Sequence, residues 1–162
     1  MGACKVLSLA EAAAAVDRWS GRGLRVVLTN GCFDLVHVGH VRYLAAARAL
    51  GDRLVVALND DASTRRLKGP GRPVLPADER AELLCALRAV DIVVPFDTDT
   101  AVDVVRALGP AVYVKGGDYG GPGRVPPEAA VAGELGAEVL YIPFVSGRSS
   151  SALIEQIRRP SA

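Results

Sequence analysis

The chain has only three cysteines, two histidines and almost no net charge across its 162 residues. Cys4, Cys32 and Cys85 lie far apart, form no C-x-x-C pair and are odd in number. A zinc ribbon and a disulfide framework are therefore not supported, and a reducing compartment fits best. We expect no bonding partner for Cys4 or Cys85 and no metal held by protein side chains.

Long apolar runs are also missing. No stretch approaches the roughly 18 apolar residues of a membrane span, and the first residues lack the charged start, apolar block and cleavage pattern of a signal peptide. Lysine and arginine number 19 against 18 acidic residues, a net charge of +1, whereas nucleic-acid-binding domains usually carry a clear basic excess. We therefore expect a cytoplasmic protein with no membrane partner and no nucleic-acid partner.

What the chain does have is a regular alternation of short apolar runs with longer helical patterns. The apolar runs predict strands at 24–29, 53–58, 92–96, 112–115 and 138–142. The helical patterns predict helices at 8–20, 40–50, 59–67, 76–89, 100–108 and 126–135, and a last helix that ends at 157. Such an alternation is typical of an α/β domain.

We therefore predict a Rossmann-like, doubly wound α/β fold, with a mostly parallel five-stranded sheet and helices on both faces. The length corresponds to one domain, since domains average roughly 150 residues. That single domain is expected over 1–162, with an N-terminal helix at 8–20 and the α/β core at 24–158.

In such a sheet, ligands bind at the carboxyl ends of the strands. Both histidines follow the first predicted long strand, in the tetrapeptide His37-Val38-Gly39-His40. One interpretation is a helix cap plus one buried ring. A second is a zinc site, which needs at least three protein ligands and has only Cys32 as a nearby soft one. A third is phosphate binding, because a helix N-terminus offers free N–H groups and Gly39 lets a phosphate approach closely.

The segment 29–40 (TNGCFDLVHVGH) resembles the signature of the cytidylyltransferase-like nucleotidyltransferases. Further segments, at 58–63, 67–73, 79–81, 87–91 and 114–119, resemble one branch of this superfamily. That branch is the adenylyltransferase (ADP-heptose synthase) domain of D-glycero-β-D-manno-heptose 1-phosphate metabolism, often fused to a sugar kinase. The similarity extends from about residue 7 to residue 157.

The resemblance implies that AMP passes from ATP to the heptose 1-phosphate, giving ADP-heptose and pyrophosphate by direct in-line attack. It also implies Mg²⁺ bound mainly through the nucleotide phosphates, a homodimer, and a separate sugar kinase upstream. His37, His40 and Lys68 would be catalytic. Lys68 and Arg72 would bind the sugar phosphate, and Asp34 would be a sugar-side or loop-ordering residue. The implied nucleotide contacts are Thr29, Asn30, Gly31, Cys32, Phe33, Gly39, His40, Lys115, Gly116, Asp118, Arg148, Ser149, Ser150 and Ser151.

Several of these residues have an ordinary structural explanation as well. Asp34 suits an Asx turn or a helix cap. Phe33 suits a core anchor, and Cys32 a small buried filler. Lys68 and Arg72 lie in a Gly/Pro-rich loop, where a mobile phosphate-binding arm and a solvated surface charge are both reasonable.

Two segments depart from the branch pattern, the first where the substrate would be contacted and the second in a loop expected to keep its phosphate binding. Residues 120–127 are richer in glycine and proline than expected, and 149–151 have three serines where the family usually has Ser-Thr-Thr. Asp118 also suits turn formation, and one hydroxyl of 149–151 would suffice for a helix cap. A sister enzyme with another nucleotide or acceptor, such as CTP with glycerol 3-phosphate, is the first alternative function. A non-catalytic nucleotide-binding module is the second.

Overall fold

A computed structural model describes residues 4–117, 125–143 and 150–158 of the chain. Within them, one sheet carries six strands in the order β1-β4-β3-β2-β5-β6, and every pair is parallel. The strands are β1 Lys5–Val6, β2 Val26–Gly31, β3 Arg53–Asn59, β4 Ile92–Phe96, β5 Val112–Gly116 and β6 Glu138–Ile142. The predicted Rossmann-like α/β fold is confirmed, and the predicted number of strands is wrong by one.

β1 is the strand that the sequence did not reveal. It has two residues and pairs at the sheet edge, Lys5 with Ile92 and Val6 with Val93. A two-residue strand carries no hydrophobic periodicity, so only the tertiary structure identifies it.

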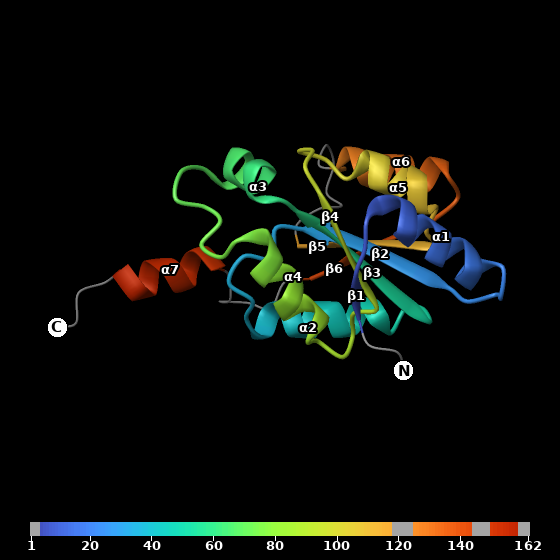
Figure 1. Ribbon diagram of the computed structural model, residues 1–162, viewed down its shortest axis with the longest axis horizontal. Helices are drawn as coiled ribbons and strands as arrows, with labels where there is room; N and C mark the ends of the chain where they lie inside the picture. Colours follow the sequence, from blue (N-terminus) through green and yellow to red (C-terminus); the bar gives the residue numbers. More distant parts are fainter. Residues whose placement is uncertain (1–3, 118–124, 144–149, 159–162) are drawn as a thin grey trace.

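Helices cover both faces of the sheet (Figure 1). They are α1 Leu9–Ser20, α2 Val38–Arg48, α3 Asp61–Lys68, α4 Ala77–Cys85, α5 Val102–Leu108, α6 Pro127–Glu134 and α7 Ser150–Arg158. α1, α5 and α6 pack on one face and α2 and α4 on the other, each group over its own apolar core. α3 and α7 lie toward the carboxyl ends of the strands (Figure 1).

The central strands are buried on both faces, as their continuous apolar runs predicted. In β3, Leu54, Val56 and Leu58 pack toward α2 and α4. Val55 and Ala57 pack toward α1 and α5 on the other face. The sheet is therefore a rigid support for the loops at its carboxyl edge.

Helix and strand ends differ from the predictions by a few residues. α1 starts as predicted, because Ser8 Oγ accepts from the Glu11 N–H at 3.3 Å and Glu11 Oε2 accepts from the Ser8 N–H at 2.9 Å. β2 continues to Gly31, two residues beyond the predicted end, since it keeps its pairing with β3 as far as Leu58. α2 begins at Val38 rather than at residue 40.

Cys4 and Cys85 form a disulfide, so the expectation that neither has a partner is wrong. Their Cα atoms are 5.0 Å apart although 81 residues separate them in sequence. β1 joins the sheet beside β4, and α4 lies against β1, which brings the two cysteines together. Neither cysteine belongs to a spacing pattern, so the pairing could not be predicted from sequence.

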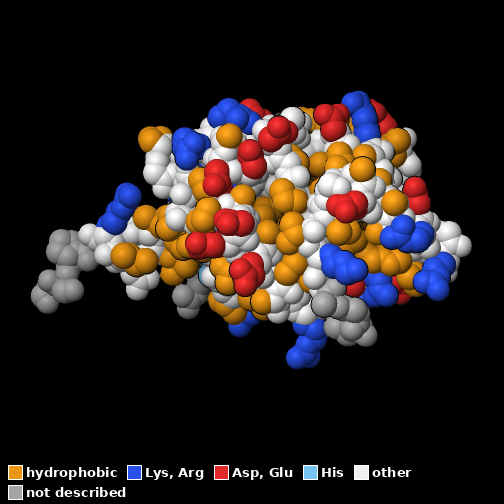
Figure 2. All heavy atoms as spheres, in the orientation of Figure 1, with side chains coloured by type: hydrophobic (Ala, Val, Ile, Leu, Met, Phe, Trp, Pro, Cys, Tyr) orange, Lys and Arg blue, Asp and Glu red, His pale blue; other side chains and the backbone are white. Residues whose placement is uncertain are grey.

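No helix in residues 4–117, 125–143 and 150–158 is both long and apolar enough to cross a bilayer. On the face seen in Figure 2, acidic and basic side chains are interspersed with apolar ones. Because the net charge is only +1, an anionic ligand would have to be held by individual Lys and Arg side chains placed close to it at the sheet edge.

Candidate functional site

The carboxyl ends of β2, β3 and β5 meet where the winding of the chain reverses. From β2 the chain proceeds to β3 and β4 on one side, whereas β5 and β6 lie on the other. α2, which follows β2, and α6, which follows β5, pack on opposite faces of the sheet. In open α/β sheets, ligands bind in the crevice at such a point. Residues 29–40 and 115–116, which were predicted to belong to the site, lie here.

The turn between β2 and α2 is tightly wound. Phe33 and Leu35 have φ angles of 46° and 53°, a region that side chains other than glycine rarely adopt. Gly31 precedes them, and a Cβ at Gly31 would lie 3.1 Å from Cε2 of Phe33. Phe33 is buried, and its ring centroid is 5.4 Å from that of His40. Strained residues of this kind cluster at functional sites, and here they set the position at which α2 begins.

His37 and His40 form the start of α2 together. The Gly39 N–H donates to His37 Nδ1 at 3.0 Å, and the His37 N–H donates to His40 Nδ1 at 3.4 Å. The two rings are stacked, with centroids 4.0 Å apart. Because the Nδ1 atom of each ring accepts a hydrogen bond, the ring hydrogen is assigned to Nε2 in both histidines. The helix-cap and phosphate-binding interpretations are therefore compatible, since the cap uses Nδ1 of each ring and not Nε2.

The surroundings keep His40 neutral. Burial, and in second place the neighbouring His37, lower the pKa of His40 from 6.5 to about 4. The first turn of α2 contains no acidic residue, so nothing there offsets the positive end of the helix dipole. A helix N-terminus with two imidazole donors is suited to bind a phosphate group.

The described residues place no third zinc ligand beside the histidine pair. Across the described stretches, no group of three or more His, Cys, Asp or Glu side chains is placed to hold a metal ion. The Cys32 thiol instead makes a weak contact with Asn59 Oδ1 at 3.9 Å.

Asp34 holds the segment between α3 and α4. Its buried carboxylate accepts from Arg72 Nε at 2.6 Å and from the N–H groups of Val74 and Leu75 at 2.9 and 3.2 Å. Burial opposes ionisation, but these two backbone donors and the Arg72 guanidinium hold the pKa of Asp34 below its ordinary value. The geometry favours the loop-ordering role for Asp34, and direct contact of Asp34 or Arg72 with a substrate stays a prediction.

Arg80 is a site-building residue that the sequence analysis missed. Its guanidinium is fully buried, and Nη1 donates to the carbonyls of Cys32 and Asn59 at 2.6 and 2.8 Å. Nε donates to the Leu75 carbonyl at 2.9 Å, and Nη2 to Asp61 Oδ1 at 2.7 Å. One side chain thus joins the segments that follow β2, β3 and α3. The sequence feature that could have revealed it is its position beside Ala81, on the inner face of the helix predicted at 76–89.

A second polar network joins the ends of β2 and β5 to α6. Lys115 Nζ donates to Asn30 Oδ1 at 2.9 Å and to Glu128 Oε1 at 2.8 Å, and Asn30 Nδ2 donates to the same Glu128 oxygen at 3.2 Å. The Tyr113 hydroxyl donates to Asn30 Oδ1 as well. Burial opposes ionisation of Glu128, but the Lys115 ammonium and the Asn30 amide hold its pKa below the ordinary value. Lys115 therefore lies at the carboxyl edge of the sheet within an ion pair, and Glu128 was not predicted.

The side chain of Thr29 points under α2 rather than into the open edge of the sheet. It is fully buried, and its Oγ1 lies 2.6 Å from the Tyr43 hydroxyl, which donates to the Val114 carbonyl at 3.2 Å. This contact fixes α2 against the sheet and occupies the Thr29 side chain, so the nucleotide contact predicted for Thr29 stays a prediction for its backbone. The strand period places its side chain under α2 rather than at the open edge.

The remaining predicted residues fall into three groups. Lys68 is exposed at the last position of α3. The Ser150 hydroxyl donates to the Asp34 carbonyl, which brings the start of α7 to the strained turn, and Ser151 follows on the same helix. Three residues lie outside the described residues: Asp118, Arg148 and Ser149.

Comparisons with known proteins point to one family. A model of the cytidylyltransferase-like family matches residues 28–122. The bifunctional protein HldE of Citrifermentans bemidjiense is 54% identical over 153 residues, which are 94% of this chain and 31% of that protein. The HldE protein of Gluconacetobacter diazotrophicus is 50% identical over 161 residues, 99% of this chain and 33% of that protein. The chain thus spans about a third of the length of these curated relatives.

A solved structure has the same fold. The lipopolysaccharide core biosynthesis protein from Thermoplasma volcanium superposes with a TM-score of 0.62 at 25% sequence identity. The superposition covers 76% of this chain and 98% of that one.

Proposed function

The chain belongs to the cytidylyltransferase-like family, and from this premise we propose that it is a nucleotidyltransferase that moves AMP from ATP to D-glycero-β-D-manno-heptose 1-phosphate. The products would be ADP-heptose and pyrophosphate. Support comes from the family match over residues 28–122 and from relatives about 50% identical to nearly the whole chain.

The histidine pair at the start of α2 is the observation that carries the proposal. An oxygen of the sugar phosphate would attack the α-phosphorus of ATP, while the bond from that phosphorus to the bridging oxygen breaks and pyrophosphate leaves. Negative charge grows on the leaving group in this step. The two imidazoles, fixed through Nδ1 by backbone N–H groups, would stabilise that charge through Nε2–H without reorganisation.

The two substrates are polyanions, so the site has to overcome their repulsion. Lys68 at the end of α3 and Arg72 in the following loop would supply positive charge. The loop that carries Arg72 is held by Asp34 from one side and by Arg80 from another. These contacts would keep the cationic arm at the carboxyl edge of the sheet.

Backbone groups would make most contacts to the nucleotide. The amide of Asn30 is already hydrogen bonded to Lys115, Glu128 and Tyr113, which fixes the neighbouring backbone at Gly31. Mg²⁺ would enter as the counter-ion of ATP. Phosphate oxygens would supply most of its ligands.

The test is a panel of nucleoside triphosphates and acceptors. The protein is incubated with each triphosphate, Mg²⁺ and one sugar phosphate or glycerol 3-phosphate, and pyrophosphate release is measured. We expect release with ATP and the heptose 1-phosphate. Release only with CTP and glycerol 3-phosphate would favour a sister enzyme, and no release with any pair would favour a binding module. An upstream sugar kinase would supply the acceptor, and a homodimer is proposed from the family resemblance.

A further inference from the structure

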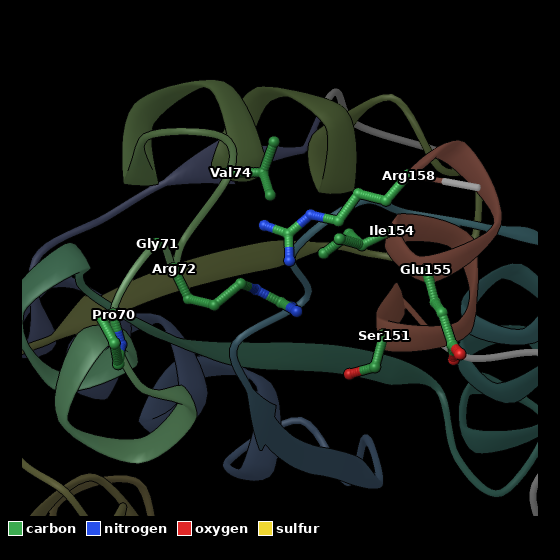
Figure 3. A pocket seen from close by; sticks show the side chains of 8 residues that line it. All are labelled: Pro70, Gly71, Arg72, Val74, Ser151, Ile154, Glu155 and Arg158. Carbon is green, nitrogen blue, oxygen red and sulfur yellow. The ribbon is translucent and has the colours of Figure 1, made fainter. Parts of the chain in front are cut away.

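A pocket of about 290 Å³ lies between residues 70–74 and α7 (Figure 3). Arg72 enters it from the loop and Arg158 from the last turn of α7. Figure 3 shows the two guanidinium groups directed into the pocket from opposite walls. The histidine pair is not part of this lining, so the pocket is a separate feature of the same edge of the sheet.

Both guanidinium groups keep donors for a ligand. Arg72 uses Nε for Asp34, and no hydrogen bond or ion pair of its Nη groups is found among the residues that the structure describes. Arg158 has no hydrogen bond or ion pair within that same part of the chain. Two planar forks in one pocket suit the oxygens of a phosphate, which arginine binds in bidentate fashion.

The other walls of the pocket fit a phosphate carried on a sugar. Ser151 offers a hydroxyl, and Val74 and Ile154 provide apolar surface. Glu155 also lines the pocket, but Figure 3 shows its carboxylate turned away from both guanidinium groups. A pocket of this size is near the lower end for small-molecule sites.

We propose that the pocket between residues 70–74 and α7 binds a phosphate group, with Arg72 and Arg158 as its two arms. Arg158 is the new element, because from sequence it is only a charged residue at a helix end. The inference rests on the proposed function only for the source of that phosphate, which is either the sugar 1-phosphate or the polyphosphate end of the nucleotide.

Direct binding tests the site without turnover. Isothermal titration calorimetry with glucose 1-phosphate and with pyrophosphate compares the full chain with Arg158→Ala. We expect the wild type to bind at least one probe and the variant to bind it about tenfold more weakly, as for the loss of one charge-assisted hydrogen-bonding group. The affinity of Arg158→Lys should lie between those of the two proteins, because lysine keeps the charge but lacks the planar guanidinium group.

Arg106→Ala is the matched control, because Arg106 is an exposed arginine on α5, in the helical layer of α1 and α6. Its affinities should equal those of the wild type. Equal affinities of the wild type and Arg158→Ala for both probes, or no binding of either probe to the wild type, would overturn the proposal.

Kinetics then identify the source of the phosphate. A rise in KM for the sugar phosphate alone in Arg158→Ala assigns the pocket to the acceptor, and a rise in KM for ATP alone assigns it to the nucleotide. A protein that binds the probes through Arg158 but releases no pyrophosphate with any substrate pair would contradict the proposed function and leave the phosphate site standing.

Discussion

The imidazole rings of His37 and His40 stack with their centroids 4.0 Å apart, and each is fixed through Nδ1 by a backbone N–H at the start of α2. The same atoms therefore both cap the helix and orient the donors of the proposed site. Loss of either ring has two effects, one on the stability of α2 and one on chemistry, and the two can be separated.

His40→Ala should lower kcat by roughly 10²–10³-fold, the usual loss for one preorganised donor to a developing charge. The accompanying loss of a cap should cost only about 1 kcal/mol of stability. Pyrophosphate release and denaturant unfolding measure the two effects. Ser8→Ala is the matched control, since it removes the cap of α1 far from the site and should leave kcat unchanged. Wild-type turnover in His40→Ala would remove its assigned role.

The pKa of His40 predicts a pH dependence of stability. Folding lowers this pKa from 6.5 to about 4, so between these values the unfolded chain takes up a proton that the folded chain does not. The free energy of unfolding should decrease as pH falls from 6.5 towards 4, and this contribution should level off below 4. Denaturant titrations across this range should show a smaller decrease for His40→Gln than for the wild type; parallel curves would contradict the pKa.

Asp34→Asn should loosen residues 72–75. The neutral amide lacks the negative charge and has only one oxygen to accept the three hydrogen bonds. The free energy of unfolding should therefore fall by about 1–3 kcal/mol. Amide hydrogen exchange at Val74 and Leu75 should accelerate. Asp103→Asn, on the surface of α5, should change neither quantity. Unchanged exchange at both amides would show that Asp34 does not order this loop.

Arg80→Lys should lower both stability and kcat/KM. A lysine keeps the charge but cannot reach the Cys32, Asn59 and Leu75 carbonyls in the geometry of the guanidinium, and the unmatched carbonyls should cost about 1–3 kcal/mol each. Urea unfolding and initial rates measure the changes, with Arg106→Lys as the control. An active variant of unchanged stability would contradict the linking role.

Lys115→Met should destabilise the protein by about 3–5 kcal/mol, because it leaves the buried Glu128 carboxylate without its cation. The double variant with Glu128→Gln should recover much of that loss, and a double-mutant cycle measures the coupling. In the wild type the pair stabilises the fold above the ordinary pKa of Glu128, 4.5, and this stabilisation is lost as pH falls through the lowered value. Additive effects of the two substitutions would contradict the ion pair.

The sequence predicted the parts of the fold that depend on local patterns. Continuous apolar runs such as 53–58 located the buried strands, and Ser8 with Glu11 located the start of α1. The two-residue β1 and the Cys4–Cys85 disulfide depend on contacts between distant segments, which no spacing in the sequence encodes.

The site was predicted by motif, and its supporting contacts were not. His37 and His40 stood out because they are the two histidines of the chain. Arg80 and Glu128 look like ordinary charges on helices until the fold buries them against strand ends. The motif also did not show that the Thr29 side chain is buried under α2, because a motif gives neighbours in sequence, whereas the pleat directs alternate side chains to opposite faces.

α2 and α6 follow neighbouring strands but pack on opposite faces of the sheet. This arrangement has a consequence for the cooperativity of unfolding. A ligand in the crevice between them would touch both helical layers at once, and neither layer could unfold without releasing it. Ligand at a hundred times its Kd adds about 2.7 kcal/mol to stability, and here that increment would be shared by two otherwise separate apolar cores. The occupied protein would then unfold as one unit, even if its layers open independently when it is empty.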